Sequence, residues 1–150
     1  MKFDVYGVGN ALVDKEFEVD ESFFQDHGIE KGLMTLGTDE ESLRLLGILT
    51  KKYGIKKQAG GGSAANTLYA VSQFGGKAFF SCKVASDETG DFFLKELGDQ
   101  KIQTNSQTQC DDGLTGRCLI MISPDAERTM HTYLGISETI SEQELDLGAA

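Results

Sequence analysis

In the stretch Ala59-Gly60-Gly61-Gly62-Ser63-Ala64-Ala65-Asn66, three glycines lead directly into an apolar helical pattern. Glycine has no Cβ, so the main-chain N–H groups of Gly61 and Gly62 can come close to a hydroxyl or a phosphate. The first turn of the following helix adds unpaired N–H donors and the positive end of its dipole. Asn66 projects from that turn, and its amide can both donate to and accept from a sugar hydroxyl. The stretch predicts either a ligand-binding loop or only a tight strand-to-helix turn.

Composition narrows the class of protein. A chain of 150 residues suits one domain with a real core, because a chain of that length buries roughly 70% of its unfolded surface. Its 24 acidic and 14 basic residues give a net charge of −10, which repels nucleic acid and anionic membranes. The N-terminus lacks the apolar region of a signal peptide, and no run approaches the roughly 20 apolar residues of a membrane span, so we expect a cytoplasmic protein. Three widely spaced cysteines and two isolated histidines suggest neither a disulfide framework nor a metal site.

Strand and helix patterns alternate along the chain. We expect strands at 3–9, 16–20, 31–36, 55–58 and 77–85, and a hairpin of 115–122 and 128–134. Helices are expected at 63–74 and 88–98. A third helix should begin at the capping box of Thr38 and Glu41, and one of its faces carries Leu43, Leu46, Leu49 and Tyr53. A second capping box, at Ser141, should begin a fourth helix. The alternation favours an α/β layered core with a mainly parallel sheet. The amphipathic strands at 16–20, 31–36, 55–58 and 115–134 indicate a separate small sheet.

Three common nucleotide and catalytic devices do not fit. The segment Gly7–Leu12 begins like a dinucleotide fingerprint, but it has Leu12 where the third glycine belongs and a strand where the helix should follow. The glycine run does not end in the Lys-Ser/Thr of a phosphate-binding P-loop. Two isolated histidines do not assemble a Ser/His/Asp set.

Four segments, taken in order, resemble the ribokinase-like, or PfkB, carbohydrate kinases, and within them the adenosine kinase-like branch. Gly7–Asp14 is similar to the first strand with its substrate aspartate, and 59–66 to the N-terminal signature of the family. Ser81–Asp91 is similar to the strand and turn that follow, and Asp125–Met130 to the lid hairpin. Each segment alone is a weak signal, whereas the four together are specific.

The resemblance implies an enzyme that uses ATP and Mg²⁺ to transfer the γ-phosphoryl group to a primary hydroxyl of a sugar or nucleoside, an adenosine-like nucleoside being favoured. The implied fold is a Rossmann-type α/β body carrying a small β-sheet lid. The whole chain, 1–150, would be the N-terminal part of one such domain, with lid strands at about 15–37, 55–59 and 115–135 inserted in the core.

The resemblance also implies the site residues. The Asp14 carboxylate and the Asn66 amide would hold ribose hydroxyls, and a carboxylate suits this task because charge-assisted hydrogen bonds are about twice as strong as neutral ones. From the residues alone, Asp14 could instead cap a turn, and Asn66 could only close the helix start. The remaining expected acceptor contacts are Asn10, Leu12, Met34, Gly61, Gly62, Ser63 and Cys118. Ordinary core packing explains Leu12, Met34 and Cys118 equally well.

Arg128 would lie over the transferring phosphate, since its fork of donors matches phosphoryl oxygens. A solvated surface pair with the neighbouring Glu127 is the alternative.

The chain departs from the family in length. The catalytic base of the family is an aspartate in a later Gly-Ala-Gly-Asp-type loop, and no such motif occurs in these 150 residues. We therefore expect the general base and the ATP site beyond residue 150, and a chain that alone is inactive and poorly soluble or oligomeric. The second function class is a non-catalytic small-molecule binding or interaction module, including a homodimer formed through unpaired lid strands.

Overall fold

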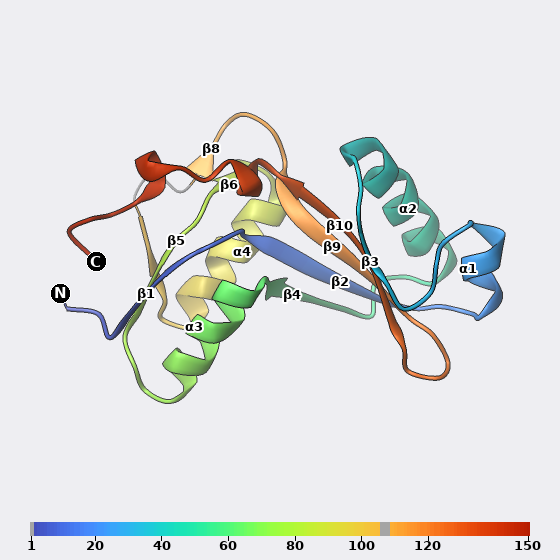
Figure 1. Ribbon diagram of the computed structural model, residues 1–150, viewed down its shortest axis with the longest axis horizontal. Coiled ribbons are helices and arrows are strands. Elements are labelled where there is room, and N and C mark those ends of the chain that lie inside the picture. Colours follow the sequence, from blue (N-terminus) through green and yellow to red (C-terminus); the bar gives the residue numbers. More distant parts are fainter. Residues whose placement is uncertain (1, 106–108) are drawn as a thin grey trace. The chain divides into compact units, whose positions relative to one another are not determined.

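The computed structural model describes residues 2–105 and 109–150, and the chain divides into two units. The first unit contains Met1–Val13, Ala59–Gly116 and Leu134–Ala150, and the second contains Asp14–Gln58 and Arg117–Tyr133. Figure 1 labels the elements along the chain. The helices are α1 Ser22–Asp26, α2 Asp39–Lys52, α3 Ser63–Gln73 and α4 Glu88–Asp99. The strands are β1 Val5–Val8, β2 Leu12–Glu18, β3 Met34–Leu36, β4 Lys57–Gly61, β5 Ala78–Ser81, β6 Val84–Ala85, β7 Gln103–Thr104, β8 Gln109–Cys110, β9 Thr115–Ile122 and β10 Arg128–Gly135.

The first unit is built on a parallel sheet of order β1-β5-β7, in which Val5 lies opposite Ala78. Its core joins Leu68 of α3 and Phe80 of β5 with Phe93 of α4. Parallel strands need crossover connections, and α3 and α4 supply them here. This part of the chain therefore has the layered α/β arrangement expected from the alternating pattern.

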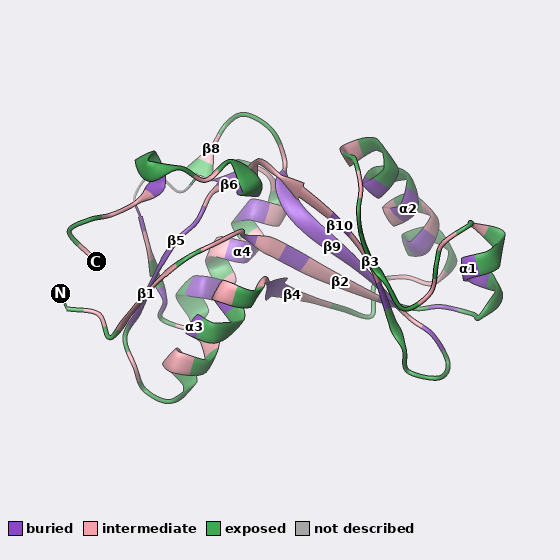
Figure 2. Cartoon of the chain, in the orientation of Figure 1, coloured by how far each residue is buried: buried purple, intermediate pink, exposed green. Residues whose placement is uncertain are grey.

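The second unit contains most of a five-stranded sheet of order β3-β10-β9-β2-β4. Buried residues of α1 and α2 lie against one face of this sheet (Figure 2). The apolar cluster there joins Phe23 and Leu49 of these helices to Phe17, Leu119 and Met121 of β2 and β9. Successive side chains on a strand point to opposite faces, so the alternate residues of β2, β9 and β10 are left to the other face.

A buried arginine fastens the start of α2 to this sheet. Nη2 of Arg117 on β9 lies 2.7 Å from Oδ1 of Asp39, and its Nε donates to Oγ of Ser42 at 2.8 Å. Its guanidinium also lies over the ring of Tyr133, 5.0 Å from the ring centre. Arg117 and Ser42 are both buried, so these contacts satisfy polar groups that water does not reach.

Several local predictions are confirmed. Thr38 and Glu41 form the reciprocal capping box at the start of α2, and β9 and β10 form the hairpin around residues 123–127. The four amphipathic stretches expected in a small sheet all contribute strands to the five-stranded sheet.

Other local predictions are wrong. Leu43 was expected on the buried face of α2 but is 49% exposed, because the face that packs on the sheet is Ser42, Leu45 and Leu49. The single strand expected at 77–85 is two strands, since β5 pairs with β1 whereas β6 pairs with β8. The capping box at Ser141 forms, but it opens only a 3₁₀ turn, Glu142–Glu144, because the backbone is extended again at Leu145.

Candidate functional site

Asp14 lies inside β2 and is partly buried. Among the described residues, no hydrogen bond reaches its carboxylate. Burial raises the pKa of Asp14 above its usual 3.8, the positive charge of Arg128 opposes this rise, and Glu16 adds to it. Because Asp14 is within a strand, the turn-capping alternative does not apply. An ionisable group kept partly from water without a hydrogen-bond partner is characteristic of a binding site.

Cys118 and Arg128 share the sheet face of Asp14. Burial raises the pKa of the Cys118 thiol to about 11, a hydrogen bond with Thr132 and the charge of Arg128 lower it, and Asp14 raises it further. The Thr132 hydroxyl lies 3.3 Å from Sγ of Cys118. The core-packing alternative fits Cys118, which is buried, although it also contributes to this polar cluster.

Arg128 pairs with a residue that the sequence reasoning missed. Its Nη2 donates to Oε1 of Glu16 at 3.3 Å, whereas Glu127, the expected surface partner, lies near Lys31. The period of two along β2 could have identified Glu16, because residues 14 and 16 fall on the same face. Thr132, two alternations after Arg128 on β10, was missed in the same way.

Met34 lies on the edge strand β3, opposite Met130 of β10. This register places the Met34 side chain on the sheet face of Arg128 and Thr132. Met34 is 55% exposed, so core packing does not account for it. The second unit thus brings Asp14, Met34, Cys118 and Arg128 to one face of one sheet.

The glycine run lies in the first unit, where it ends β4 and precedes α3. Gly62 adopts φ +96°, and a Cβ there would lie 2.8 Å from the carbonyl oxygen of Asn10. The N–H of Gly60 donates to Oε2 of Glu96 at 2.5 Å. Only a residue without a Cβ fits at Gly62, so the close approach of the two backbones explains the glycine physically.

The start of α3 has no side-chain cap within the described part of the chain. Its N-cap is Gly62, whose carbonyl accepts the first helical hydrogen bond, from the N–H of Asn66 at 2.9 Å. Asn66 is exposed in the first turn and, among the described residues, makes no capping hydrogen bond at this helix start. Ser63 is the first helical residue and Leu12 the first residue of β2. The first unit thus places Asn10 beside Gly62, next to the helix start that carries Ser63 and Asn66.

A cavity of about 380 Å³ in the second unit lies elsewhere, beside α2, β3 and β10. Its lining includes Arg44, Leu45 and His131 and only residues outside the predicted site. The candidate site is placed at Asp14 and its neighbours, because a partly buried carboxylate to which no described residue hydrogen-bonds lies there.

Two properties of the described residues bear on partners. No helix in 2–105 or 109–150 is long and apolar enough to cross a bilayer. Over the same residues, no group of three or more His, Cys, Asp or Glu side chains is arranged to hold a metal ion.

The chain is similar to several known proteins. Residues 33–150 match the family model described as pfkB family carbohydrate kinase. The chain is 34% identical to the structure of adenosine kinase from Sinorhizobium meliloti, with a TM-score of 0.82, over 97% of this chain and 43% of that one. A probable sugar kinase from Rhizobium etli CFN 42 gives 32% identity and a TM-score of 0.85 over the same shares.

Guanosine-inosine kinase of Escherichia coli K12 is 29% identical over 128 residues, which cover 83% of this chain and 30% of that protein. The chain thus spans less than half the length of these relatives. Its mixed α/β fold matches the corresponding part of the adenosine kinase fold. Because the family model covers well over half of the chain, the chain belongs to the pfkB family of carbohydrate kinases.

Proposed function

We propose that this chain supplies the acceptor-binding part of an ATP-dependent kinase, which transfers the γ-phosphoryl group to a primary hydroxyl of a sugar or nucleoside. The observation that carries the proposal is Asp14, a partly buried carboxylate that no described residue hydrogen-bonds, on the same sheet face as Arg128. A purine nucleoside is the favoured acceptor, because the relatives include an adenosine kinase and a guanosine-inosine kinase.

Each predicted site residue has a role that suits its chemistry. Asp14 accepts hydrogen bonds from two adjacent ribose hydroxyls, and its affinity for them is increased because it is partly desolvated. The backbone at Gly61 and Gly62 and the Asn66 amide contact hydroxyls at close range. The other acceptor contacts that we assign are Asn10, Leu12, Met34, Ser63 and Cys118.

Arg128 acts on the phosphate. Its side chain is 53% exposed and its Nη2 lies 3.3 Å from Oε1 of Glu16, so the guanidinium is available to phosphoryl oxygens. Positive charge near the transferring group stabilises the charge that develops in the transition state. Mg²⁺ bound with ATP would neutralise phosphate charge, and we assign its ligands to no residue of this chain. We place the general base outside residues 1–150.

The environment that we propose is the cytoplasm. All three cysteines are free, which suits a reducing compartment. The net charge of −10 disfavours nucleic acid as a partner.

The experiment is a phosphoryl-transfer assay on a chimera, in which this chain replaces the matching 43% of the S. meliloti adenosine kinase. Adenosine, inosine, guanosine and ribose serve as acceptors, and the chain alone and the parent enzyme as controls. We expect acceptor-dependent ADP release from the chimera and none from the chain alone. A folded chimera that binds ATP but phosphorylates none of the acceptors would contradict the proposal.

A second candidate function is self-association through β3. This edge strand exposes Leu36 to 59% together with Met34, and an exposed apolar edge can pair with another strand. Sedimentation of the chain and of its Leu36→Lys variant tests this. A dimer that the variant converts to a monomer supports pairing, and a monomer at high concentration contradicts it.

A further inference from the structure

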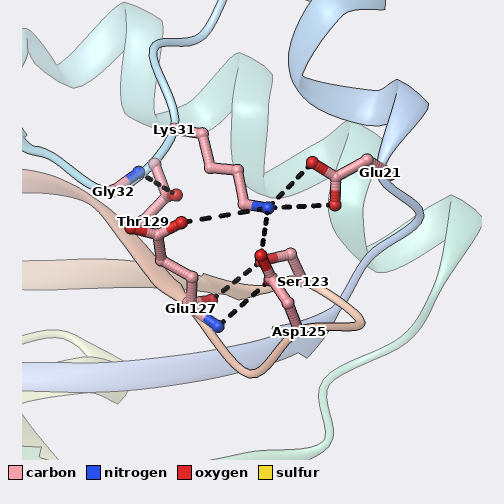
Figure 3. A network of polar contacts seen from close by, with 7 residues as sticks. All are labelled: Glu21, Lys31, Gly32, Ser123, Asp125, Glu127 and Thr129. Carbon is pink, nitrogen blue, oxygen red and sulfur yellow. Dashed lines mark hydrogen bonds and ion pairs between the residues drawn. The ribbon is translucent and has the colours of Figure 1, made fainter.

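The ammonium group of Lys31 is surrounded by three carboxylates (Figure 3). Its Nζ lies 2.8 Å from Oε1 of Glu21, just before α1, and 2.7 Å from Oδ2 of Asp125. Oε2 of Glu127 is 3.8 Å away. Asp125 and Glu127 both belong to the turn that joins β9 to β10. The ion pairs of Lys31 therefore connect the segment around α1 to this turn.

Asp125 connects Lys31 to the interior of the turn, because its second carboxylate oxygen accepts hydrogen bonds from residues of the turn. Oδ1 of Asp125 accepts from Oγ of Ser123 at 2.6 Å and from the N–H of Glu127 at 3.3 Å. The N–H of Ser123 also donates to the carbonyl of Glu127 at 3.0 Å. A displacement of Asp125 would therefore disturb both ends of the turn.

The residues after Lys31 fix the start of β10. The N–H of Gly32 donates to Oγ1 of the buried Thr129 at 2.9 Å, and the N–H of Met130 donates to the carbonyl of Leu33 at 2.9 Å. Gly32 has φ +81°, and a Cβ there would lie 2.5 Å from Oε1 of Glu127. The segment 31–33 thus lies closely along residues 127–130.

Arg128 lies in the sequence between the two residues, Glu127 and Thr129, that contact Lys31 and Gly32. Glu127 precedes it in the turn held by Lys31, and Thr129 follows it with the bond from Gly32. Among the described residues, its guanidinium pairs only with Glu16, so its backbone is fixed while its side chain can move. A catalytic arginine needs this combination, because misplacement by about 1 Å can lower turnover by about a hundredfold.

We propose that Lys31 is a positioning residue, which fixes the β9–β10 turn and thereby the backbone of Arg128 for phosphoryl transfer. The contacts described above support the role of Lys31 in fixing the turn, whereas its role in catalysis rests on the proposed function. Lys31→Met removes the charge but keeps most of the side-chain length, and Lys31→Arg keeps the charge. Lys95→Met is the matched control, because Lys95 forms an exposed pair with Asp99 on α4 in the first unit.

The first test is hydrogen exchange in the 150-residue chain, which needs no kinase activity. In Lys31→Met we expect the amides of Gly32, Ser123, Glu127 and Met130 to exchange about tenfold or more faster, with α2 unchanged and with recovery in Lys31→Arg. Unchanged exchange at these amides in Lys31→Met would overturn the proposal. Equal acceleration in the Lys95→Met control would overturn it too.

The second test measures turnover in the chimera. Lys31→Met should lower kcat about tenfold to a hundredfold, leave KM for the acceptor within about twofold, and be rescued by Lys31→Arg. Unaltered kcat would overturn the catalytic part, even if the turn loosens. An inactive chimera with Lys31 intact would contradict the proposed function, and with it the catalytic part, whereas exchange would still decide whether Lys31 fixes the turn.

Discussion

Arg128 on β10 reaches across β9 to Glu16 on β2, with 3.3 Å between Nη2 and Oε1. The arginine side chain is 53% exposed and that of Glu16 is 20% exposed. Ion pairs at the surface contribute about 0–1 kcal/mol. The guanidinium can therefore leave Glu16 for a phosphate at little energetic cost.

The first prediction concerns this arginine. Arg128→Ala in the chimera should lower kcat by about 10²–10³-fold with little change in KM for the acceptor, because the contact forms with charge that develops in the transition state. Arg128→Lys should recover part of the turnover. Steady-state kinetics measures both, with Arg44→Ala, an exposed arginine on α2, as the control. Equal loss in the Arg44 variant would show a nonspecific effect of charge.

The second prediction couples stability to binding at Asp14. Burial raises the pKa of Asp14 in the folded chain, so the folded state holds a proton that the unfolded state has released. The free energy of unfolding should fall as pH rises from about 3.8 through the folded pKa, and the loss should persist at neutral pH. Asp14→Asn should therefore stabilise the chain at pH 7 and give no such gain at pH 3. Denaturant unfolding at the two pH values measures this.

The same variant should weaken acceptor binding. Each hydrogen bond to a charged group contributes about 1.5–3 kcal/mol, so Asp14→Asn should lower nucleoside affinity at least tenfold in the chimera. Calorimetric titration with adenosine checks this, with ATP affinity as the internal control. A destabilised variant with unchanged nucleoside affinity would assign Asp14 a structural role.

The third prediction compares two glycines. Gly62→Ala should destabilise the chain by about 1 kcal/mol or more, because Gly62 has positive φ and its new Cβ would meet the Asn10 carbonyl. Gly47→Ala should stabilise it by about 0.5–1 kcal/mol, because Gly47 lies inside α2 with open space around it. Chemical denaturation gives both values. Similar effects of the two substitutions would contradict the backbone explanation.

The fourth prediction concerns Arg117. Arg117→Ala leaves the buried Ser42 hydroxyl without its donor and removes the contact with Asp39, so it should cost about 2 kcal/mol of stability. Asp39→Asn should cost less, since Asp39 is partly exposed. Thermal unfolding of the two variants tests this order. A smaller loss for Arg117→Ala than for Asp39→Asn would contradict it.

The sequence pattern predicted helices, caps and turns correctly where residues close together in the chain determine them. The capping box at Thr38, the hairpin around 123–127 and the helix after Gly62 all depend on neighbours in the chain. On α2, Leu46, Leu49 and Tyr53 pack in or against the apolar cluster as expected, and only Leu43 was misassigned. Leu45 takes its place, because contact with the strands selects between two neighbouring apolar stripes of the helix.

The site was predictable only in part. Asp14, Arg128 and the glycine run were predicted because their segments resemble those of a known family. Glu16 could have been found from the alternation along β2. The contact of Lys31 with Asp125 could not, because the two residues are separated by 94 positions and no local periodicity joins them.

Binding of the acceptor by this chain can be measured by nuclear magnetic resonance titration of the ¹⁵N-labelled chain. Adenosine, inosine, guanosine and ribose are added at millimolar concentration to the chain and to its Asp14→Asn variant. We expect saturable shifts for nucleosides at amides around residues 12–14, 61–66 and 118, and their loss in the variant. A dispersed spectrum of a folded chain that shows no shift at these amides with any of the four compounds would contradict it.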